Sequence, residues 1–393
     1  MRSAALVLLA LLSVQANARG RDLGISFEGT PGPLNAITDV PGVEVGQTTL
    51  VEGQQVRTGV TAIFPRGKAN PKPVYGGYFT LNGNGEMTGR AYLEDFGIVQ
   101  GPIGISDTNA VGQVYAGIQQ WSAKHFGEAT WPVVAETWSG YLNDIEGSHV
   151  TAETAMAALD AARPGPVGEG NVGGGTGMVC FGFKGGIGTA SRVVATDGQR
   201  YTVGVLVQCN TGDRKVLRIS GAPVGAAWTK KWLPCFDPKL GRGGSGPLKA
   251  CTPDGVAGEP PPDQGSIIIV VGTDAPLMPK QLDRVAKRAA MGLARLGSYS
   301  GNSSGDLIVS FSTQPQQVNH EDQEHPSAIT PIANAHIDRL FEATVQAAEE
   351  AIVNALVAAK TMSGANGTRY FAMPHDELRD ILKRYNRLEE PAK

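Results

Sequence analysis

Charged side chains are scarce in this sequence, and no stretch of it gathers charge of one sign. Asp, Glu, Lys and Arg make up 18% of the residues, and the formal net charge is −3. Nucleic acids and anionic lipid surfaces bind proteins through concentrated positive charge. The sequence therefore predicts no nucleic-acid partner and no membrane-surface partner. Its 41% content of hydrophobic residues is enough for a large buried core.

The patterns of the commoner metal and catalytic sites are also missing. The six histidines are scattered, with no HExxH pair and no Cys/His ligand pair. The glycine-rich stretch 170–188 lacks the Gly-Lys-Ser/Thr ending of a P-loop, which favours close backbone packing around a site over phosphate binding. No GxSxG turn comes with a convincing His and Asp. We therefore expect no metal, no cofactor and no Ser-His-Asp triad.

Long apolar runs are absent as well, because none approaches the roughly 20 residues that span a bilayer. Residues 1–18 read MRSAALVLLALLSVQANA, with Arg2 at the start, an apolar run over 4–12 and a small-x-small ending at 16–18. This order is typical of a cleavable secretory signal peptide. We expect an exported, periplasmic protein whose mature chain begins near Arg19.

Only four cysteines are present, Cys180, Cys209, Cys235 and Cys251. Exported proteins meet an oxidising compartment, so up to two bridges in three connectivities are open. Cys235 and Cys251 flank loop-like sequence and form the one plausible pair, although the sequence leaves open whether they join. Cys180 and Cys209 lie in apolar, strand-like runs and are interpreted as small buried residues.

Glycine and proline are abundant, with 52 and 25 residues, which excludes a helical bundle. Short apolar or β-branched runs alternate with Gly, Pro and Asn clusters over 37–212 and predict strands with tight connections. Further apolar runs at 266–273 and 306–313 predict two more strands. Apolar residues at three- and four-residue spacing predict helices over 110–126, 150–162, 279–296, 332–361 and 376–385.

One stretch, 237–264, is rich in proline and glycine. Such sequence cannot carry a strand ladder, and we expect it to be an exposed, mobile loop. No internal repeat and no tandem domain is visible, so the mixed α and β pattern predicts one large layered domain.

Ser266 begins the apolar run SIIIVVGT directly after that stretch. If the bond between Gly265 and Ser266 were cut, Ser266 would carry both a hydroxyl and a free α-amine. An α-amine has a pKa of about 7.7 to 8.0 and can therefore accept the hydroxyl proton near neutral pH. From the pattern alone, a serine that caps a turn at the start of a strand is the commoner explanation.

A set of longer strings adds a resemblance that covers nearly the whole mature chain in order. They are DVPGVEVGQTTL (39–50), GYFTLNGNGEMTG (77–89), PIGISDTNAVG (102–112), ETWSGYLND (136–144), VGGGTGMVCFGFKGGIGTASR (172–192), VLVQCN (205–210), GSIIIVVGTDAPLMPKQL (265–282) and GNSSGDLIVSFST (301–313). With these strings the chain resembles the D-aminopeptidase and β-peptidyl aminopeptidase family.

The resemblance implies an α/β fold of four layers, an αββα sandwich of the N-terminal-nucleophile-hydrolase type, as a single domain over 19–393. It implies a precursor that cuts itself between Gly265 and Ser266 into the chains 19–265 and 266–393, which stay together. Because relatives are multimers, a homo-oligomer of the two-chain protomer is expected. The implied activity is release of N-terminal β-, D- or small L-amino acids from short peptides, amides and esters.

Residue by residue, the resemblance makes Ser266 the nucleophile and gives Ser304 and Asp306 of GNSSGD a part in proton transfer. Asn210 matches the asparagine whose side-chain amide donates to the developing oxyanion. Tyr141 matches a tyrosine that helps to stabilise the tetrahedral intermediate. Without the resemblance, each of these residues has an ordinary structural explanation as a turn former, a core ring or a loop polar group.

An aminopeptidase must also hold the ammonium group of its substrate, which requires a carboxylate near the nucleophile. Glu136 is the candidate, with Trp138 as a wall of the pocket, although Glu136 is equally suited to be a structural hydrogen-bond acceptor. Asn82, Asn84 and Glu86 either line the same region or turn a hairpin, and the sequence does not decide between the two.

Two alternatives to the aminopeptidase stay open. One is a related self-processing amidase or acyltransferase, such as an ornithine acetyltransferase or a nylon-oligomer hydrolase, but both are expected to use threonine where this chain has Ser266. The other is a non-catalytic exported binding protein of the same fold. The natural substrate and the preference among β-, D- and L-residues also stay open.

Overall fold

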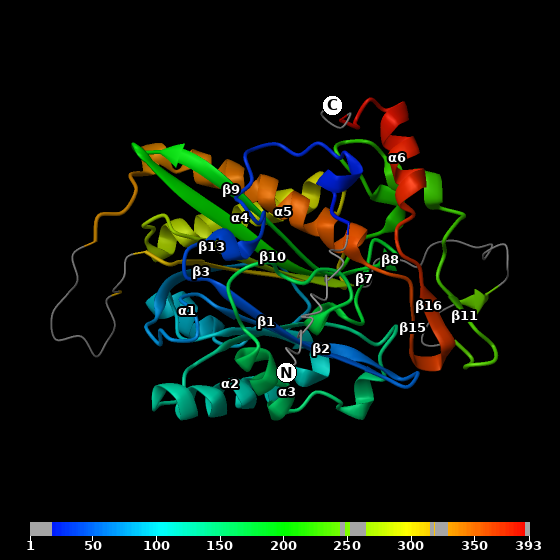
Figure 1. Cartoon of the computed structure of the whole chain (residues 1–393), viewed down its shortest axis with the longest axis horizontal. Coiled ribbons are helices and arrows are strands. Elements are labelled where there is room, and N and C mark those ends of the chain that lie inside the picture. The colour runs from blue at the N-terminus through cyan, green and yellow to red at the C-terminus, as the bar shows by residue number, and fades with distance from the viewer. Residues whose placement is uncertain (1–17, 244–247, 252–264, 315–317, 319–328, 390–393) are drawn as a thin grey trace, which may run out of the picture.

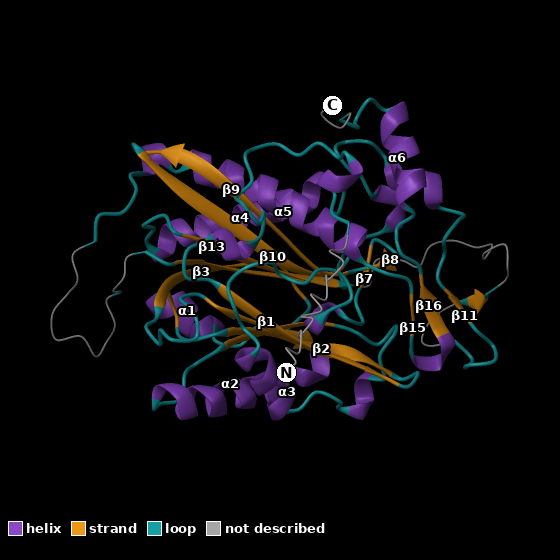
Figure 2. Ribbon diagram, in the orientation of Figure 1, coloured by secondary structure: helices purple, strands orange, loops and turns teal. Residues whose placement is uncertain are grey.

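The computed structural model describes residues 18–243, 248–251, 265–314, 318 and 329–389. Its centre is two sheets that stack face to face, with helices on both outer faces (Figures 1 and 2). The four-stranded sheet has the order β1 (Glu44–Glu52), β2 (Val56–Phe64), β5 (Ile103–Asp107) and β6 (Val133–Thr137). The six-stranded sheet has the order β4 (Ile98–Val99), β3 (Val74–Gly83), β14 (Gly305–Ser312), β13 (Ser266–Thr273), β10 (Gln199–Asn210) and β9 (Gly186–Thr196).

Helices α4 (Pro279–Arg295) and α5 (Asp338–Ala358) cover the outer face of the six-stranded sheet. Helices α2 (Val111–Phe126) and α3 (Ala152–Asp160) cover the outer face of the four-stranded sheet (Figure 1). The order of layers is therefore αββα, as expected. A short helix α1 (Arg90–Phe96) follows β3, and α6 (His375–Arg384) lies near the C-terminus. No helix in the described ranges is long and apolar enough to cross a membrane.

Strand β13 shows why the central sheets form from continuous apolar sequence. Ile268 and Val270 point into the core between the two sheets, whereas Ile267 and Ile269 pack toward the helices. Successive side chains of a strand point to opposite faces, so a strand that is covered on both faces must be apolar throughout. The run SIIIVVGT satisfies this requirement, and every residue of β13 is buried.

The high glycine content has a packing cause where helices lie directly on strands. A Cβ atom added at Gly188 of β9 would lie 2.0 Å from the carbonyl oxygen of Ala351 in α5. A Cβ at Gly46 of β1 would lie 2.0 Å from the carbonyl oxygen of Ala158 in α3. Only glycine allows backbones to approach this closely. The predicted close packing around 170–188 is thus partly the contact between β9 and α5.

The predicted helices form with small changes of boundary. The helix expected over 332–361 is the shorter α5, preceded by a 3-10 turn at Asn334–His336. The apolar run at 98–106 divides at Gly101 and Pro102 into β4 and β5, which belong to different sheets. Proline donates no ladder hydrogen bond, which explains a break there. The helix α1 and the strand β9 were not predicted.

The expectation that 237–264 carries no strand ladder is wrong for part of that stretch. Lys249–Ala250 (β12) pairs with Cys235–Phe236 (β11), which in turn pairs with β16 (Thr368–Tyr370), beside β15 (Met362–Ser363). This small sheet lies at one end of the molecule (Figure 1). Residues 252–264 lie outside the described residues, as do residues 1–17 of the predicted signal peptide.

All four cysteines are paired, and one of the two pairs corrects the sequence interpretation. Cys235 bonds Cys251, with Cα atoms 5.0 Å apart, and Cys180 bonds Cys209, with Cα atoms 5.5 Å apart. Cys180 and Cys209 are fully buried, as expected, but they are not free thiols. Their pairing depends on the contact of the short strand β7 (Val179–Cys180) with β10, and no local sequence pattern predicts that contact.

Candidate functional site

Ser266 lies at the first position of β13, in register with Asn210 at the last position of the antiparallel neighbour β10. Side chains of directly opposed residues lie on the same face of a sheet, with Cβ atoms about 5 Å apart. That face is the one on which Ile268 turns toward the space between the two sheets. The register therefore brings the hydroxyl of Ser266 and the amide of Asn210 together at one edge of the inter-sheet core.

The hydroxyl of Ser266 is held from the other side by strand β14. The backbone N–H of Gly305 donates to Ser266 Oγ over 3.1 Å, and Ser266 is only 6% exposed. An N–H that points at a serine oxygen favours the negative charge that develops when the hydroxyl loses its proton. Ser266 is thus a buried serine with a polar partner, and not only a residue that caps a turn.

The orientation of the Asn210 amide is fixed by two backbone groups. Its Oδ1 accepts from the N–H of Val179 over 2.7 Å, and its Nδ2 donates to the carbonyl oxygen of Trp138 over 2.9 Å. An amide nitrogen carries two hydrogens, and the bond to Trp138 uses one of them. The second hydrogen suits a ligand oxygen bound near Ser266.

Ser304 and Asp306 flank Gly305 and form one hydrogen-bonded group. Ser304 Oγ donates to Asp306 Oδ1 over 2.6 Å, and the hydroxyl of Ser300 donates to the other carboxylate oxygen. Thr211, the residue after Asn210, has its hydroxyl 3.2 Å from Ser304 Oγ. Both Ser304 and Asp306 are buried. This group therefore lies around Gly305, the residue whose N–H donates to Ser266 Oγ.

Glu136 stands at the end of β6, in the opposite sheet, and is 3% exposed. Its carboxylate accepts the N–H of Glu86 over 2.9 Å and the hydroxyl of Thr108. A Cβ at Gly85 would lie 3.0 Å from Glu136 Oε1 and 3.4 Å from the Cα of Gly305, so the carboxylate is close to the backbone that holds Ser266. No cation pairs with Glu136 among the residues that the structure describes.

Burial raises the pKa of the Glu136 carboxyl above its usual range. The hydrogen bonds from Thr108 and Glu86 lower this pKa again, but only in part, and the nearby carboxylate of Asp107 raises it further. A positively charged ligand would relieve both costs, because it replaces lost solvation and balances the negative charge. The chemistry of this position therefore favours an ammonium group.

The segment after β3 lines the same region, which the sequence had left undecided. Asn82 Nδ2 donates to the carbonyl oxygens of Ser304, over 2.6 Å, and Gly301, over 2.8 Å. Asn84 Nδ2 donates to the carbonyl oxygen of Ser303 over 2.7 Å. These bonds tie the segment to the loop that carries Ser304, and the backbone of Glu86 then reaches Glu136.

The rings of Trp138 and Tyr141 pack against each other. Their ring centroids are 4.8 Å apart in an edge-to-face arrangement, and the ring of Tyr370 is 5.5 Å from that of Tyr141. Trp138 enters the site through its backbone, since its carbonyl oxygen accepts from Asn210. Tyr370 is fully buried and was not singled out from the sequence, because only the fold brings the C-terminal strand β16 to this place.

Lys184 is a second residue that sequence reasoning passed over. It is fully buried, and its Nζ donates to the carbonyl oxygens of Met178 (2.7 Å), Gly185 (2.8 Å) and Gly175 (3.3 Å). Burial lowers the pKa of this amine well below its usual value. Lys184 therefore ties together the glycine-rich loop from which Val179 reaches Asn210. The lysine in a glycine-rich run was the available signal, but it was considered only as part of a P-loop.

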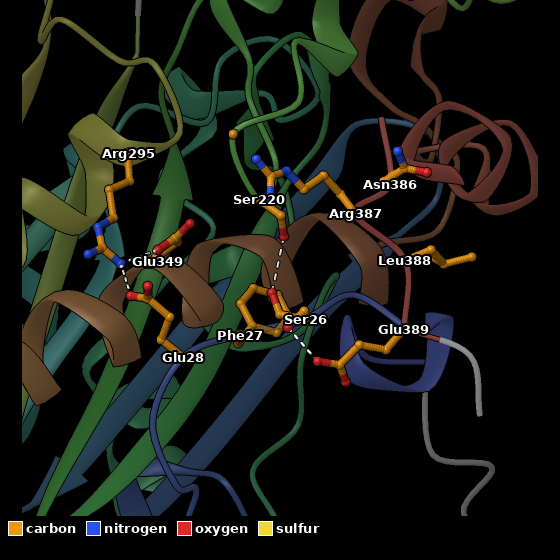
Figure 3. Close-up of a pocket in the computed structure, with 11 residues that line it drawn as sticks. Ser26, Phe27, Glu28, Ser220, Arg295, Glu349, Asn386, Arg387, Leu388 and Glu389 are labelled. Atoms are coloured by element: carbon orange, nitrogen blue, oxygen red, sulfur yellow. Dashed lines mark hydrogen bonds and ion pairs between the residues drawn. The ribbon is translucent and has the colours of Figure 1, made fainter. Parts of the chain in front are cut away.

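A pocket of about 540 Å³ lies apart from this group (Figure 3). Arg295 lines it and pairs with Glu28 over 2.9 Å and with Glu349 over 3.0 Å. Ser26 donates to Glu389 over 2.5 Å and accepts from Ser220 over 3.1 Å. Because these groups satisfy one another, and because none of the Ser266 cluster lines the pocket, the site is assigned to Ser266.

Comparisons with known proteins agree with this geometry. The model of peptidase family S58 matches residues 35–370. The chain is 50% identical to the β-peptidyl aminopeptidase BapA of Sphingosinicella microcystinivorans over 392 residues, which covers 97% of this chain and 96% of the relative. It is 45% identical to the enzyme of the same name from Sphingosinicella xenopeptidilytica over 394 residues, covering 97% and 95%.

Two solved structures share the fold. The L-aminopeptidase D-Ala-esterase/amidase of Ochrobactrum anthropi, described as a variant of the Ntn hydrolase fold, has a TM-score of 0.81 and 39% identity, covering 94% of this chain and 99% of that one. A β-aminopeptidase of Burkholderia sp. has a TM-score of 0.80 and 42% identity, covering 93% and 99%. The αββα fold of the N-terminal-nucleophile type is thereby confirmed.

Gly265, the residue before Ser266, packs closely against the backbone of Asn210. A Cβ atom at this position would lie 1.6 Å from the carbonyl oxygen of Asn210. Any larger residue must therefore push the backbone before Ser266 away from β10.

We expect the substitution Gly265→Ala to slow the cut between residues 265 and 266. The Cβ must move by more than an ångström, and a displacement of this size typically costs about 10²-fold in rate. The half-time of cutting, followed on denaturing gels, measures the effect. Gly83→Ala is the matched control, because Gly83 lies nearby in β3 and a Cβ there meets its nearest neighbour at 3.5 Å. Equal half-times for the two variants would contradict the argument.

Proposed function

The chain belongs to peptidase family S58 and is a serine aminopeptidase, and on that premise we propose that it releases N-terminal β-amino acids from short peptides, amides and esters. The observation that carries the proposal is the position of Ser266, which pairs with Asn210 and accepts from the N–H of Gly305, close to the buried carboxylate of Glu136. The names of the two Sphingosinicella relatives and of the Burkholderia structure support the β-residue preference.

In this proposal the chain makes its own catalyst by cutting itself before Ser266. The cut gives Ser266 a free α-amine whose pKa of about 7.7 to 8.0 suits a general base. Ser266 Oγ attacks the first carbonyl of the substrate, and the amine takes the hydroxyl proton and returns it to the leaving group. Water then attacks the acyl-serine ester and releases the amino acid, so that the enzyme returns to its starting state.

Three neighbouring groups are assigned to the steps in which charge develops. The Asn210 amide donates to the oxyanion, with Tyr141 beside it. Ser304, whose hydroxyl donates to Asp306, is assigned to proton transfer at the new chain end. Removal of one oxyanion donor typically costs about 2.7 to 4 kcal/mol of barrier, so Asn210 is expected to be the most important of the three.

Glu136 is assigned to the substrate's ammonium group. A β-amino acid carries its amine one carbon further from the reacting carbonyl than an α-amino acid does. Glu136 lies in the opposite sheet, and its carboxylate is close to Gly305, the residue whose N–H donates to Ser266 Oγ. We assign it to the amine of a β-residue, and we expect the amine of an α-residue, which is one carbon closer to the carbonyl, to reach it less well.

We also propose that the protein is exported and that its leader is removed after Ala18. The backbone nitrogen of Arg19 is 2.8 Å from Asp22 Oδ2, so removal of the leader would create an ammonium beside a carboxylate. The Arg19 guanidinium bonds the carbonyl oxygens of Thr189 and Asn35, which anchors this new chain end in the fold. The two disulfides support an oxidising compartment.

Association of the cut protomers into a homo-oligomer completes the proposal. Trp131 and Phe96 are 61% and 49% exposed, and both stack on Tyr92. Exposed aromatic clusters of this kind are enriched where proteins meet one another. The surface formed by Phe96 of α1 and by Trp131, which lies two residues before β6, is therefore the candidate interface.

We expect mass spectrometry of the protein, expressed with its leader, to find one chain that begins at Arg19 and one that begins at Ser266. Ser266→Ala removes the hydroxyl that attacks, so it should give a single uncut chain without hydrolytic activity. Ser220→Ala, an exchange at a surface serine, should be cut and active like the wild type. Active wild-type protein with an intact bond between residues 265 and 266 would contradict the mechanism.

A panel of β-Ala, D-Ala and L-Ala p-nitroanilides tests the substrate class. The proposed binding of a β-amine by Glu136 predicts the largest kcat/KM for the β-Ala compound. The release of p-nitroaniline measures all three under the same conditions. A larger kcat/KM for D-Ala would instead assign the chain a D-residue preference, and no release from any of them would leave Ser266 without the proposed activity.

The exchange Glu136→Gln tests the ammonium site and its pH dependence. Loss of a buried charge partner typically costs about 2 to 5 kcal/mol, so KM for β-Ala p-nitroanilide should rise by at least about 30-fold. Because the pKa of Glu136 is raised, wild-type binding should weaken as the pH falls through a value above the usual Glu range, and the variant should lack this limb.

Two controls make the Glu136 result specific. Propionyl p-nitroanilide has no amine, so its KM should be the same for Glu136→Gln and for the wild type. Glu94→Gln exchanges an exposed carboxylate on α1 and should leave both substrates unaffected. An equal loss for the two substrates in Glu136→Gln would show that Glu136 supports the structure and does not bind the ammonium.

A further inference from the structure

The disulfide between Cys180 and Cys209 joins the two segments that hold Asn210. Cys209 directly precedes Asn210 at the end of β10, and Cys180 directly follows Val179 in β7. Val179 is the residue whose N–H donates to Asn210 Oδ1 over 2.7 Å. The covalent bond and the hydrogen bond therefore connect the same two dipeptides, side by side.

Strand β7 is short and is held by its neighbours: Lys184 Nζ donates to the carbonyl oxygen of Met178, and the N–H of Phe181 donates to that of Thr211 over 2.7 Å. It is two residues long and pairs with β8 (Phe183–Lys184), which is equally short (Figure 1). Phe181, directly after Cys180, has a φ of 46°, a conformation that costs energy for a residue with a side chain. The disulfide adds a covalent constraint directly beside the N–H that Val179 presents to Asn210.

The distance between Asn210 and the nucleophile makes that constraint matter for chemistry. Asn210 pairs with Ser266 in the ladder, and Cys209 pairs with Ile267. The disulfide is therefore attached to the residue next to Asn210, and that residue pairs with the neighbour of Ser266. An amide that is free to rotate would present its oxygen as often as its N–H, and the oxygen repels an oxyanion.

We infer that the Cys180–Cys209 disulfide is a positioning device for the proposed reaction. It fixes Val179 against Asn210, so that the amide keeps its N–H directed at the oxyanion. This inference rests on the proposed role of Asn210. The second disulfide, Cys235–Cys251, lies at the small sheet of β11, β12, β15 and β16. It does not join the two segments that hold Asn210.

The test compares Cys180→Ala/Cys209→Ala with the matched pair Cys235→Ala/Cys251→Ala. Each variant is assayed with β-Ala p-nitroanilide, and the rate is divided by the amount of cut chain, which mass spectrometry quantifies. A variant that is cut more slowly therefore does not show a falsely low kcat. For the first pair we expect kcat to fall roughly tenfold, less than the roughly 10²- to 10³-fold cost of losing an oxyanion donor completely. KM should change by less than about twofold, and the second pair should keep its kcat.

A double-mutant cycle with Asn210→Ala separates positioning from general loss of structure. If the disulfide acts through Asn210, its removal should cost nothing further in the Asn210→Ala background. The same tenfold loss in both backgrounds would overturn the inference, as would an unchanged kcat in the first pair. Cys180→Val/Cys209→Ala restores lost volume and replaces the first pair if that pair does not fold.

The cycle also distinguishes this inference from the proposed function. If Asn210→Ala alone is fully active, the oxyanion role of Asn210 fails, and the inference fails with it. If Asn210→Ala is impaired and the cysteine variant is not, only the positioning role of the disulfide is lost. Loss of activity in Ser266→Ala supports the nucleophile in either case.

Discussion

The pairing of β10 with β13 is the constraint on which the site depends. Because Asn210 and Ser266 are directly opposed at the ends of these strands, a shift of the register by one residue would turn one of them to the other face of the sheet. The register is fixed along the rest of the ladder by apolar residues that alternate between the inter-sheet core and the helices. The large hydrophobic core thus fixes the relative position of two polar side chains at its edge, Asn210 and Ser266.

The opposite sheet contributes negative charge that the fold leaves incompletely balanced. Burial raises the pKa of both Asp107 and Glu136, although each accepts hydrogen bonds. Asp107 is held by the hydroxyl of Thr58 and, more distantly, by the amide of Asn143, and it stands one residue beyond the partner of Glu136 in the β5–β6 ladder. Two buried carboxylates so close together cost stability. In the proposed function, the ammonium group of a bound substrate offsets part of this cost.

Much of the fold follows from local sequence, whereas little of the site does. The apolar run of β13 and the spacing of α4 predict these elements, because their burial needs a periodic pattern. Strand β9 escaped prediction, since its glycines serve the contact with α5 and weaken the strand signal. Ser266 gained weight only from resemblance, because a catalytic serine without a local motif looks like any other. The Cys180–Cys209 bond and the position of Tyr370 depend on contacts between distant segments, which no local pattern contains.

The order of the six-stranded sheet explains how the two pieces stay associated when the chain is cut at the start of a central strand. Strands β13 and β14 come after Ser266, and both lie between strands that precede it, with β3 on one side and β10 on the other. Helix α5 likewise comes after the cut and packs on β9, which precedes it. Separation of the pieces would break two ladders and expose both faces of β13. The ladders on both sides of β13 and β14 therefore hold the two pieces together when the bond before Ser266 is cut.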